Sequence, residues 1–72
     1  MNTKRSELMN SRLEKGFTRN QFAEMLGVSA EHIKSLEYGR VNPSTHLLFR
    51  ISSVLEKSPE ELFPDIVLPA QK

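Results

Sequence analysis

The chain has 72 residues, of which 38% are hydrophobic and 26% are charged, so one small globular unit is expected and a multidomain enzyme is excluded. It has no cysteine and no apolar run near the roughly 18 residues of a membrane span, which excludes disulfides, thiolate metal sites and transmembrane helices and favours a cytoplasmic protein. The net charge of +1 is uneven: residues 1–50 hold eight basic and five acidic side chains, whereas residues 51–72 hold two basic and four acidic ones. This asymmetry suggests that one end of the molecule meets a polyanion.

The first predicted helix ends at Gly16. At 100° per residue, one face of this helix collects the apolar residues and a single basic one, namely Leu8, Met9, Arg12 and Leu13. A charge in the middle of an apolar face would cost roughly several kcal/mol if it had no partner. The pattern therefore indicates that Arg12 is paired within the fold.

Two further short helices follow, with a very short link between them. Thr18 begins a capping-box pattern that opens the second helix, and Gly27 ends that helix. Ser29 caps the third helix, and Gly39 supplies the left-handed position that ends it. Since only residues 27–29 separate the two helices, they form a helix-turn-helix, whose second helix suits a DNA major groove.

The second half of the chain predicts two more helices and a tail. The fourth helix spans about residues 44–56, and its apolar face consists of Leu47, Leu48, Ile51, Val54 and Leu55. Ser58 caps the fifth helix, and Pro64 ends it. Residues 64–72 form a C-terminal tail that carries its own apolar run.

These features resemble the Cro and phage-repressor type of helix-turn-helix domain, also called the XRE family. The likeness covers about residues 5–63 and is carried by EKGFTRNQFAEMLGVSAEHIKSLEYGRVNPS and by LLFRISSVLEKSPEELF. Several features of these stretches match the family's pattern together: the glycine before the second helix, Ala23, LGVS, Ile33, LEYGR and the following Pro-Ser.

The resemblance implies an all-α fold: a compact, five-helix, lambda-repressor-like domain in residues 1–63, with its helix-turn-helix at about residues 18–37. It also implies a sequence-specific DNA-binding transcriptional regulator, with repressor as the expected role. The expected partner is double-stranded DNA, and no cofactor is expected. Related domains pair the residues at positions 12 and 37, so a structural ion pair is expected between Arg12 and Glu37. His32 and His46 lack metal-site spacing, and no nucleophile–base constellation is present, so neither a metal site nor an enzyme is expected.

The outer face of the third helix is the predicted base-reading surface. With Ile33 and Leu36 turned to the core, the candidate base-contacting residues are Ser29, Ala30, Glu31, Lys34 and Ser35. A glutamate accepts hydrogen bonds from a cytosine amino group, an alanine touches a thymine methyl group, and a lysine reaches guanine or phosphate. The alternative is an ordinary solvated helix face.

Phosphate contacts are expected from the start of the second helix and from the loop after the third. Helix N-termini present free N–H groups and a partial positive charge to anions. Arg19 is the leading candidate, at a position where the family usually has glutamine. The other candidates are Asn20, Tyr38, Arg40, Asn42 and Ser44. For each, the alternative is an ordinary exposed polar residue.

Surplus apolar residues near the C-terminal end suggest a homodimer. The candidate dimer or partner residues are Phe49, Phe63, Ile66, Val67 and Leu68. A two-fold dimer would place its recognition helices about 34 Å apart on a pseudo-palindromic operator. The alternative is a tail folded back on the core. A second functional hypothesis keeps the fold but makes it a protein-interaction module that binds another regulator and has little DNA affinity.

Overall fold

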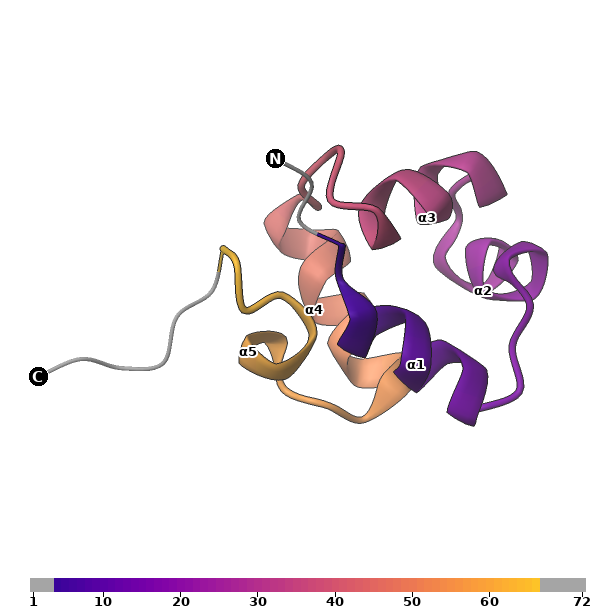
Figure 1. Cartoon of the computed structure of the whole chain (residues 1–72). Coiled ribbons are helices and arrows are strands. Elements are labelled where there is room, and N and C mark those ends of the chain that lie inside the picture. Colours follow the sequence, from indigo (N-terminus) through magenta and orange to yellow (C-terminus); the bar gives the residue numbers. More distant parts are fainter. Residues whose placement is uncertain (1–3, 67–72) are drawn as a thin grey trace, which may run out of the picture.

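A computed structural model describes residues 4–66 of the chain. Its five helices are α1 (Ser6–Glu14), α2 (Arg19–Leu26), α3 (Ala30–Glu37), α4 (Thr45–Leu55) and α5 (Pro59–Leu62) (Figure 1). There is no strand in this part of the chain. The all-α, five-helix fold predicted from the sequence is confirmed. Within residues 4–66, no helix is long and apolar enough to cross a membrane.

Side-chain caps begin four of the five helices, and the sequence predicted three of them, at Thr18, Ser29 and Ser58. Thr18 and Ser58 form complete capping boxes at the starts of α2 and α5. Ser29 and Ser44 each accept a hydrogen bond from the backbone N–H three residues further on. A cap satisfies N–H groups that the first turn of a helix leaves without a partner, so each helix begins at a defined residue.

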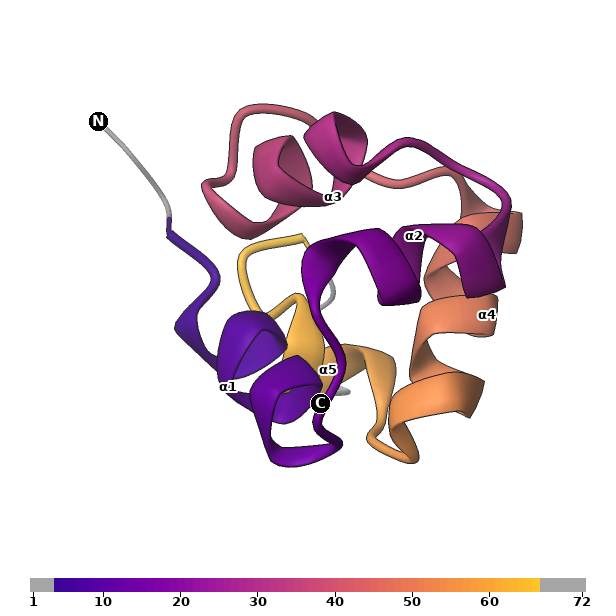
Figure 2. The same cartoon turned by 90° about the vertical axis from the view of Figure 1, so that its right-hand side faces the viewer.

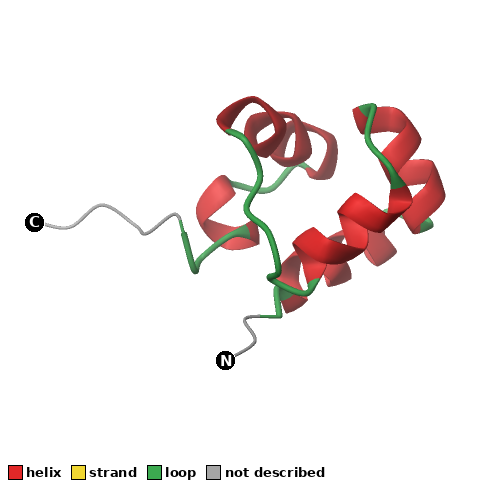
Figure 3. Cartoon of the chain, turned by 90° about the horizontal axis from the view of Figure 1, so that it is seen from above, coloured by secondary structure: helices red, strands yellow, loops and turns green. Residues whose placement is uncertain are grey.

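The turn between α2 and α3 depends on Gly27, whose φ of +75° lies in the left-handed region that side chains disfavour. The two helices pack closely on each other. Figure 2 shows α3 along the top of the molecule with α2 beneath it, while α1 lies below α2 and α4 runs down the right-hand side. From above, α3 is seen at the rim of the molecule (Figure 3). The helix-turn-helix therefore presents the outer side of α3 to solvent.

One apolar core holds the helices together. All five helices contribute to its buried members, together with Phe63 directly after α5: Leu8, Phe22, Ala23, Leu26, Ile33, Leu36, Leu47, Ile51, Leu55, Leu62 and Phe63. Arg50 of α4 donates to the carbonyl oxygens of Met25 (3.1 Å) and Leu26 (3.3 Å). These bonds satisfy carbonyls at the end of α2 and fix it to α4.

Two expectations about apolar residues were wrong. Leu13 is 56% exposed instead of lying in the core, because α1 turns Leu8, Ser11 and Arg12 inward. Phe63 is fully buried, so it is a core residue and cannot form part of a dimer surface. The guanidinium of Arg5 lies over the Phe63 ring, with its central carbon 5.1 Å from the ring centroid.

Arg5 joins the two ends of the described chain. Its Nε and Nη2 atoms donate to the two carboxylate oxygens of Asp65 at 3.0 and 2.8 Å. Nη1 donates to the carbonyl oxygens of Leu36 (2.7 Å) and Val41 (2.9 Å), and Nη2 also donates to Oδ1 of Asn42 (2.8 Å). An arginine has five N–H donors, and each one is used here. Arg5 is thus a structural residue that the sequence pattern did not single out.

Candidate nucleic-acid interface

The outer face of α3 carries the predicted base-reading residues. Ile33 and Leu36 are buried, while Glu31 is exposed and the other candidates on the helix, Ala30, Lys34 and Ser35, are half-buried. Ser29 is exposed, and its hydroxyl oxygen accepts the hydrogen bond that caps the helix. The structure thus places these residues on one surface, in agreement with the face assignment made from the spacing. Whether they contact bases stays a prediction.

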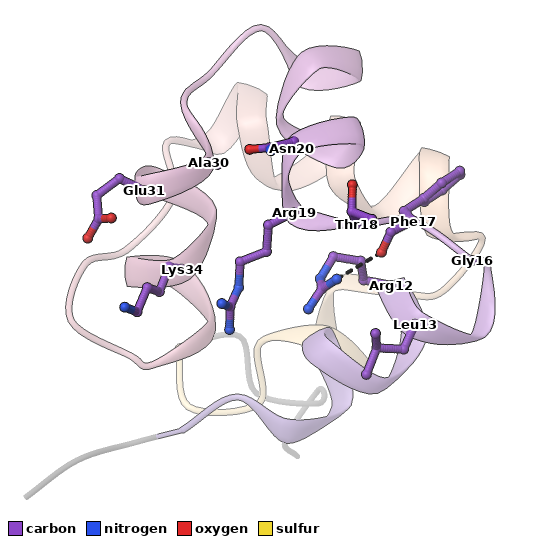
Figure 4. Close-up of a pocket in the computed structure, with 10 residues that line it drawn as sticks. All are labelled: Arg12, Leu13, Gly16, Phe17, Thr18, Arg19, Asn20, Ala30, Glu31 and Lys34. Carbon is purple, nitrogen blue, oxygen red and sulfur yellow. Dashed lines mark hydrogen bonds between the residues drawn. The ribbon is translucent and has the colours of Figure 1, made fainter.

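An open groove of about 660 Å³ runs beside this face, between the end of α1, the start of α2 and the first turns of α3. Four charged residues line it: Arg12, Arg19, Glu31 and Lys34. Figure 4 shows the Arg19 side chain running from the start of α2 into the space between α1 and α3, while the carboxylate of Glu31 points outward. Three of the four charges are positive, so the groove favours anions.

A buried ion triad lies beneath this groove. The fully buried Glu37 accepts hydrogen bonds from Arg12 Nε at 2.5 Å and from Arg19 Nε at 2.9 Å. Arg12 also donates from Nη1 to the carbonyl oxygen of Phe17 at 2.8 Å, the bond drawn dashed in Figure 4. Arg12 and Glu37 therefore form an ion pair, and the same pair fixes the turn that leads into α2. With two guanidinium groups and one carboxylate, the triad carries a net charge of +1.

Arg19 remains partly accessible within the triad, with 32% of its side chain exposed. Its pKa is raised above the ordinary arginine value, chiefly because of its hydrogen bond to Glu37. The sequence predicted Arg19 as a phosphate contact but gave no sign of its link to Glu37, because the two residues are 18 positions apart.

Three cations surround the ring of Tyr38. The charged groups of Lys4, Arg19 and Arg40 lie 5.5, 5.7 and 5.4 Å from the ring centroid, within the range of cation–π contact. Between residues 4 and 66, no carboxylate forms an ion pair with Lys4 or Arg40. Sequence reasoning missed Lys4 at this site, because the contact joins residues 34 positions apart and has no local signal.

The remaining predicted phosphate-contacting residues are exposed, but two of them also make hydrogen bonds that stabilise the fold. Asn20 is exposed at the start of α2 and lines the groove. Ser44 is exposed, but its hydroxyl caps α4. Asn42 is also exposed, yet its side-chain oxygen accepts from Arg5, which leaves only the amide nitrogen free to donate. Within residues 4–66, no group of three or more His, Cys, Asp or Glu side chains could hold a metal ion.

Among the described residues, the predicted dimer or partner residues differ in exposure. Phe49 is 58% exposed on α4, and Ile66 is 39% exposed after α5. Phe63 is buried, as described above, and Val67 and Leu68 lie outside the described residues. The proposed contribution of the C-terminal tail to a dimer therefore stays a prediction.

Comparison with known proteins agrees with this geometry. A family model described as "Helix-turn-helix" matches residues 8–62. Two proteins of Archaeoglobus fulgidus, each named "Uncharacterized HTH-type transcriptional regulator", are similar to this chain over 59 residues. The first is 36% identical, and the match covers 82% of this chain and 84% of that protein. The second is 32% identical, and the match covers 82% of this chain and 83% of that protein. No solved structure matches significantly. The chain therefore belongs to the helix-turn-helix family of the Cro/C1 (XRE) type, a family of DNA-binding transcriptional regulators and not of enzymes.

Proposed function

We propose that the protein is a sequence-specific transcriptional repressor of the cytoplasm that reads the DNA major groove with α3. The observation that carries this proposal is the exposed outer face of α3 beside a groove lined by Arg12, Arg19 and Lys34. In a helix-turn-helix, the second helix enters the major groove while the first crosses the backbone. This docking would bring α3 to the base edges and the start of α2 to the phosphates.

Base reading in this complex falls to the first two turns of α3. Glu31 is exposed at the second position of the helix and would accept a hydrogen bond from a cytosine amino group. Ala30 would contact a thymine methyl group, and Lys34, one turn further along, would reach guanine or a phosphate. Ser35 completes the surface as a short hydroxyl donor and acceptor.

Phosphate binding falls to residues around Tyr38 and the start of α2. Arg19, Arg40 and Lys4 surround the Tyr38 ring, and no exposed carboxylate among the described residues forms an ion pair with them. Such contacts release counterions from DNA, so binding should weaken as salt rises. Asn20 adds a side-chain donor beside the positive end of the α2 dipole.

A homodimer on a pseudo-palindromic operator completes the proposal. Each subunit carries a net charge of only +1, so a single domain has a modest electrostatic affinity for DNA. Two subunits would double the number of base and phosphate contacts, with the recognition helices about 34 Å apart. The exposed Phe49 and Ile66 are the described candidates for the contact between subunits.

The test is fluorescence anisotropy of a labelled duplex library across a salt series. Wild type is compared with the double variant Arg19→Ala, Lys34→Ala and with a matched control, Lys15→Ala, Lys57→Ala, which removes two cations outside the groove. We expect a palindromic site to be enriched, and the double variant to flatten the slope of log affinity against log salt by about 1 to 2. The control should keep the wild-type slope.

A second candidate function rests on the exposure of Phe49. A large aromatic side chain that is 58% exposed on α4 is suited to contact with another protein. A protein-interaction module of the same fold would bind a second regulator through this residue and would bind DNA weakly. Absence of DNA binding at low salt would favour this function over the repressor.

A further inference from the structure

The guanidinium of Arg19 is attached to the protein through only one of its donors. Nε donates to Oε1 of Glu37 at 2.9 Å, and the Nη atoms make no hydrogen bond of normal geometry within residues 4–66. Since an arginine has five N–H donors, four remain open. The side chain is 32% exposed and lines the groove of Figure 4, so a ligand in the groove can reach the guanidinium.

Glu37 is a rigid anchor for this guanidinium. Its side chain is fully buried, and it accepts from Arg12 through Nε at 2.5 Å and Nη2 at 3.4 Å. The Arg12 side chain is only 6% exposed and balances the charge of Glu37. The net positive charge of the triad therefore resides on its accessible member, Arg19.

Tyr38 supports the same guanidinium from another direction. It follows Glu37 directly in the chain, and the central carbon of the Arg19 guanidinium lies 5.7 Å from its ring centroid. The hydrogen bond at Nε and the ring contact restrict the rotation of the Arg19 side chain in the free protein. The side chain therefore loses less conformational entropy when a ligand binds. The open donors thus have a defined direction before any ligand arrives.

Resting on the proposed function, we infer that Glu37 is a positioning residue: it holds Arg19 by Nε so that the Nη edge meets a DNA phosphate. This role requires arginine at position 19 and not merely a positive charge. The single ammonium nitrogen of a lysine has to bind either the buried carboxylate or the phosphate, whereas a guanidinium forks between the two.

The first experiment compares the DNA affinity of Arg19→Lys with that of Arg19→Ala. A matched control, Arg50→Lys, makes the same chemical change in an arginine that contacts backbone carbonyls at the end of α2. We expect Arg19→Lys to lose about tenfold in affinity, close to the loss of Arg19→Ala, because a lysine held by the buried Glu37 carboxylate no longer reaches the phosphate and an alanine has no donor. Arg50→Lys should stay within about twofold of wild type. If Arg19→Lys also stays within about twofold, charge alone suffices and the inference is overturned.

A second measurement needs no DNA and no variant that risks unfolding. The Hε proton of Arg19 should exchange with solvent about tenfold more slowly than the Hε proton of Arg40, which donates to no described side chain. Equal exchange rates, measured by nuclear magnetic resonance on the free protein, would show that Glu37 does not hold Arg19. If the Hε proton is protected but wild type fails to bind DNA at low salt, the anchor exists and the proposed function fails, and the phosphate role of Arg19 fails with it.

Discussion

Arg5 and Arg19 are both held by a carboxylate, but they differ in how many of their donors the protein uses. Arg5 has a side chain that is 1% exposed and uses all five donors within the fold. Arg19 is 32% exposed and uses one. The presence of an ion pair therefore does not by itself separate a structural arginine from one that binds a ligand. The two kinds differ in how many N–H donors make no hydrogen bond within the protein.

Arg12 lies between these two cases and shows why burial matters as well. It donates twice to Glu37 and once to the carbonyl of Phe17, and its side chain is 6% exposed. Because so little of its side chain is exposed, it stabilises the turn before α2 and leaves ligand contact to Arg19. The comparison predicts that stability is most sensitive at the buried carboxylate, and that DNA affinity is most sensitive at the accessible guanidinium.

The largest effect on stability is expected for Glu37→Ala. Removing the buried carboxylate leaves the Arg12 guanidinium without a counter-charge in the interior, which lowers the free energy of unfolding by roughly 3–5 kcal/mol. Urea titration followed by circular dichroism measures the change. Glu24→Ala, at an exposed position on α2, serves as a control and should stay within about 0.5 kcal/mol of wild type. A loss below about 1 kcal/mol for Glu37→Ala would mean that Arg12 finds water or another partner.

Arg5→Ala should separate stability from DNA binding. It removes five hydrogen bonds and leaves the carbonyl of Leu36 with only the N–H of Gly39 as a donor, so the free energy of unfolding should fall by about 2–3 kcal/mol. The folded fraction should bind DNA within about twofold of wild type, because Arg5 has no open donor. Urea titration and anisotropy on the same sample test both parts. A loss of affinity as large as that of Arg19→Ala would contradict the distinction drawn from open donors.

The hydrogen bonds between Arg5 and Asp65 should also make the free energy of unfolding depend on pH. The hydrogen bonds from Arg5 hold the pKa of Asp65 below its ordinary value of 3.8. A lowered pKa in the folded state means that the stabilisation is complete above pH 3.8 and is lost as the pH falls through the folded-state pKa. Asp65→Asn should therefore be less stable than wild type by about 1 kcal/mol at pH 7, with a difference that shrinks on acidification. Thermal unfolding from pH 7 to pH 2 measures this difference, and a constant gap would show that Asp65 does not titrate with folding.

The smallest effect is expected at an exposed carboxylate, Glu56. It pairs with Lys15 at 3.0 Å, but its side chain is 76% exposed and its φ is +58°, in the region that favours glycine. Glu56→Gly should raise the free energy of unfolding by about 0.5 kcal/mol, because the relief of backbone strain exceeds the loss of a surface pair. Lys15→Ala removes the pair alone and should change stability by less. If both variants destabilise equally, the ion pair matters more than the backbone.

The helices and their limits could be predicted from the sequence because their signals are local. Thr18, Ser29, Ser44 and Ser58 each act on a backbone group three residues away, so the cap is visible in the sequence itself. The spacing of Ile33 and Leu36 likewise determined which face of α3 is buried. The fold and the candidate base-reading surface follow from these short-range patterns.

The contacts that sequence reasoning missed join distant residues or depend on how a helix is rotated. Arg5 meets a carboxylate 60 positions away, and no local pattern indicates such a partner. Leu13 has the hydrophobicity of a core residue, but α1 is rotated to bury Arg12 against Glu37 and leaves Leu13 exposed. Phe63, predicted for a partner surface, is instead buried among core residues from distant parts of the chain and contacts a guanidinium from its other end, which no local pattern indicates.

The contact between Arg5 and Asp65 also bears on the order in which the molecule assembles. Closing a loop of this length is entropically unfavourable, so the contact should form after the local helices and open before them. The same guanidinium binds the carbonyl of Leu36 in the last turn of α3. Opening of the Arg5–Asp65 contact would thereby reach the helix that faces DNA in the proposed complex, so the rigidity of that helix depends on residues near both ends of the described chain.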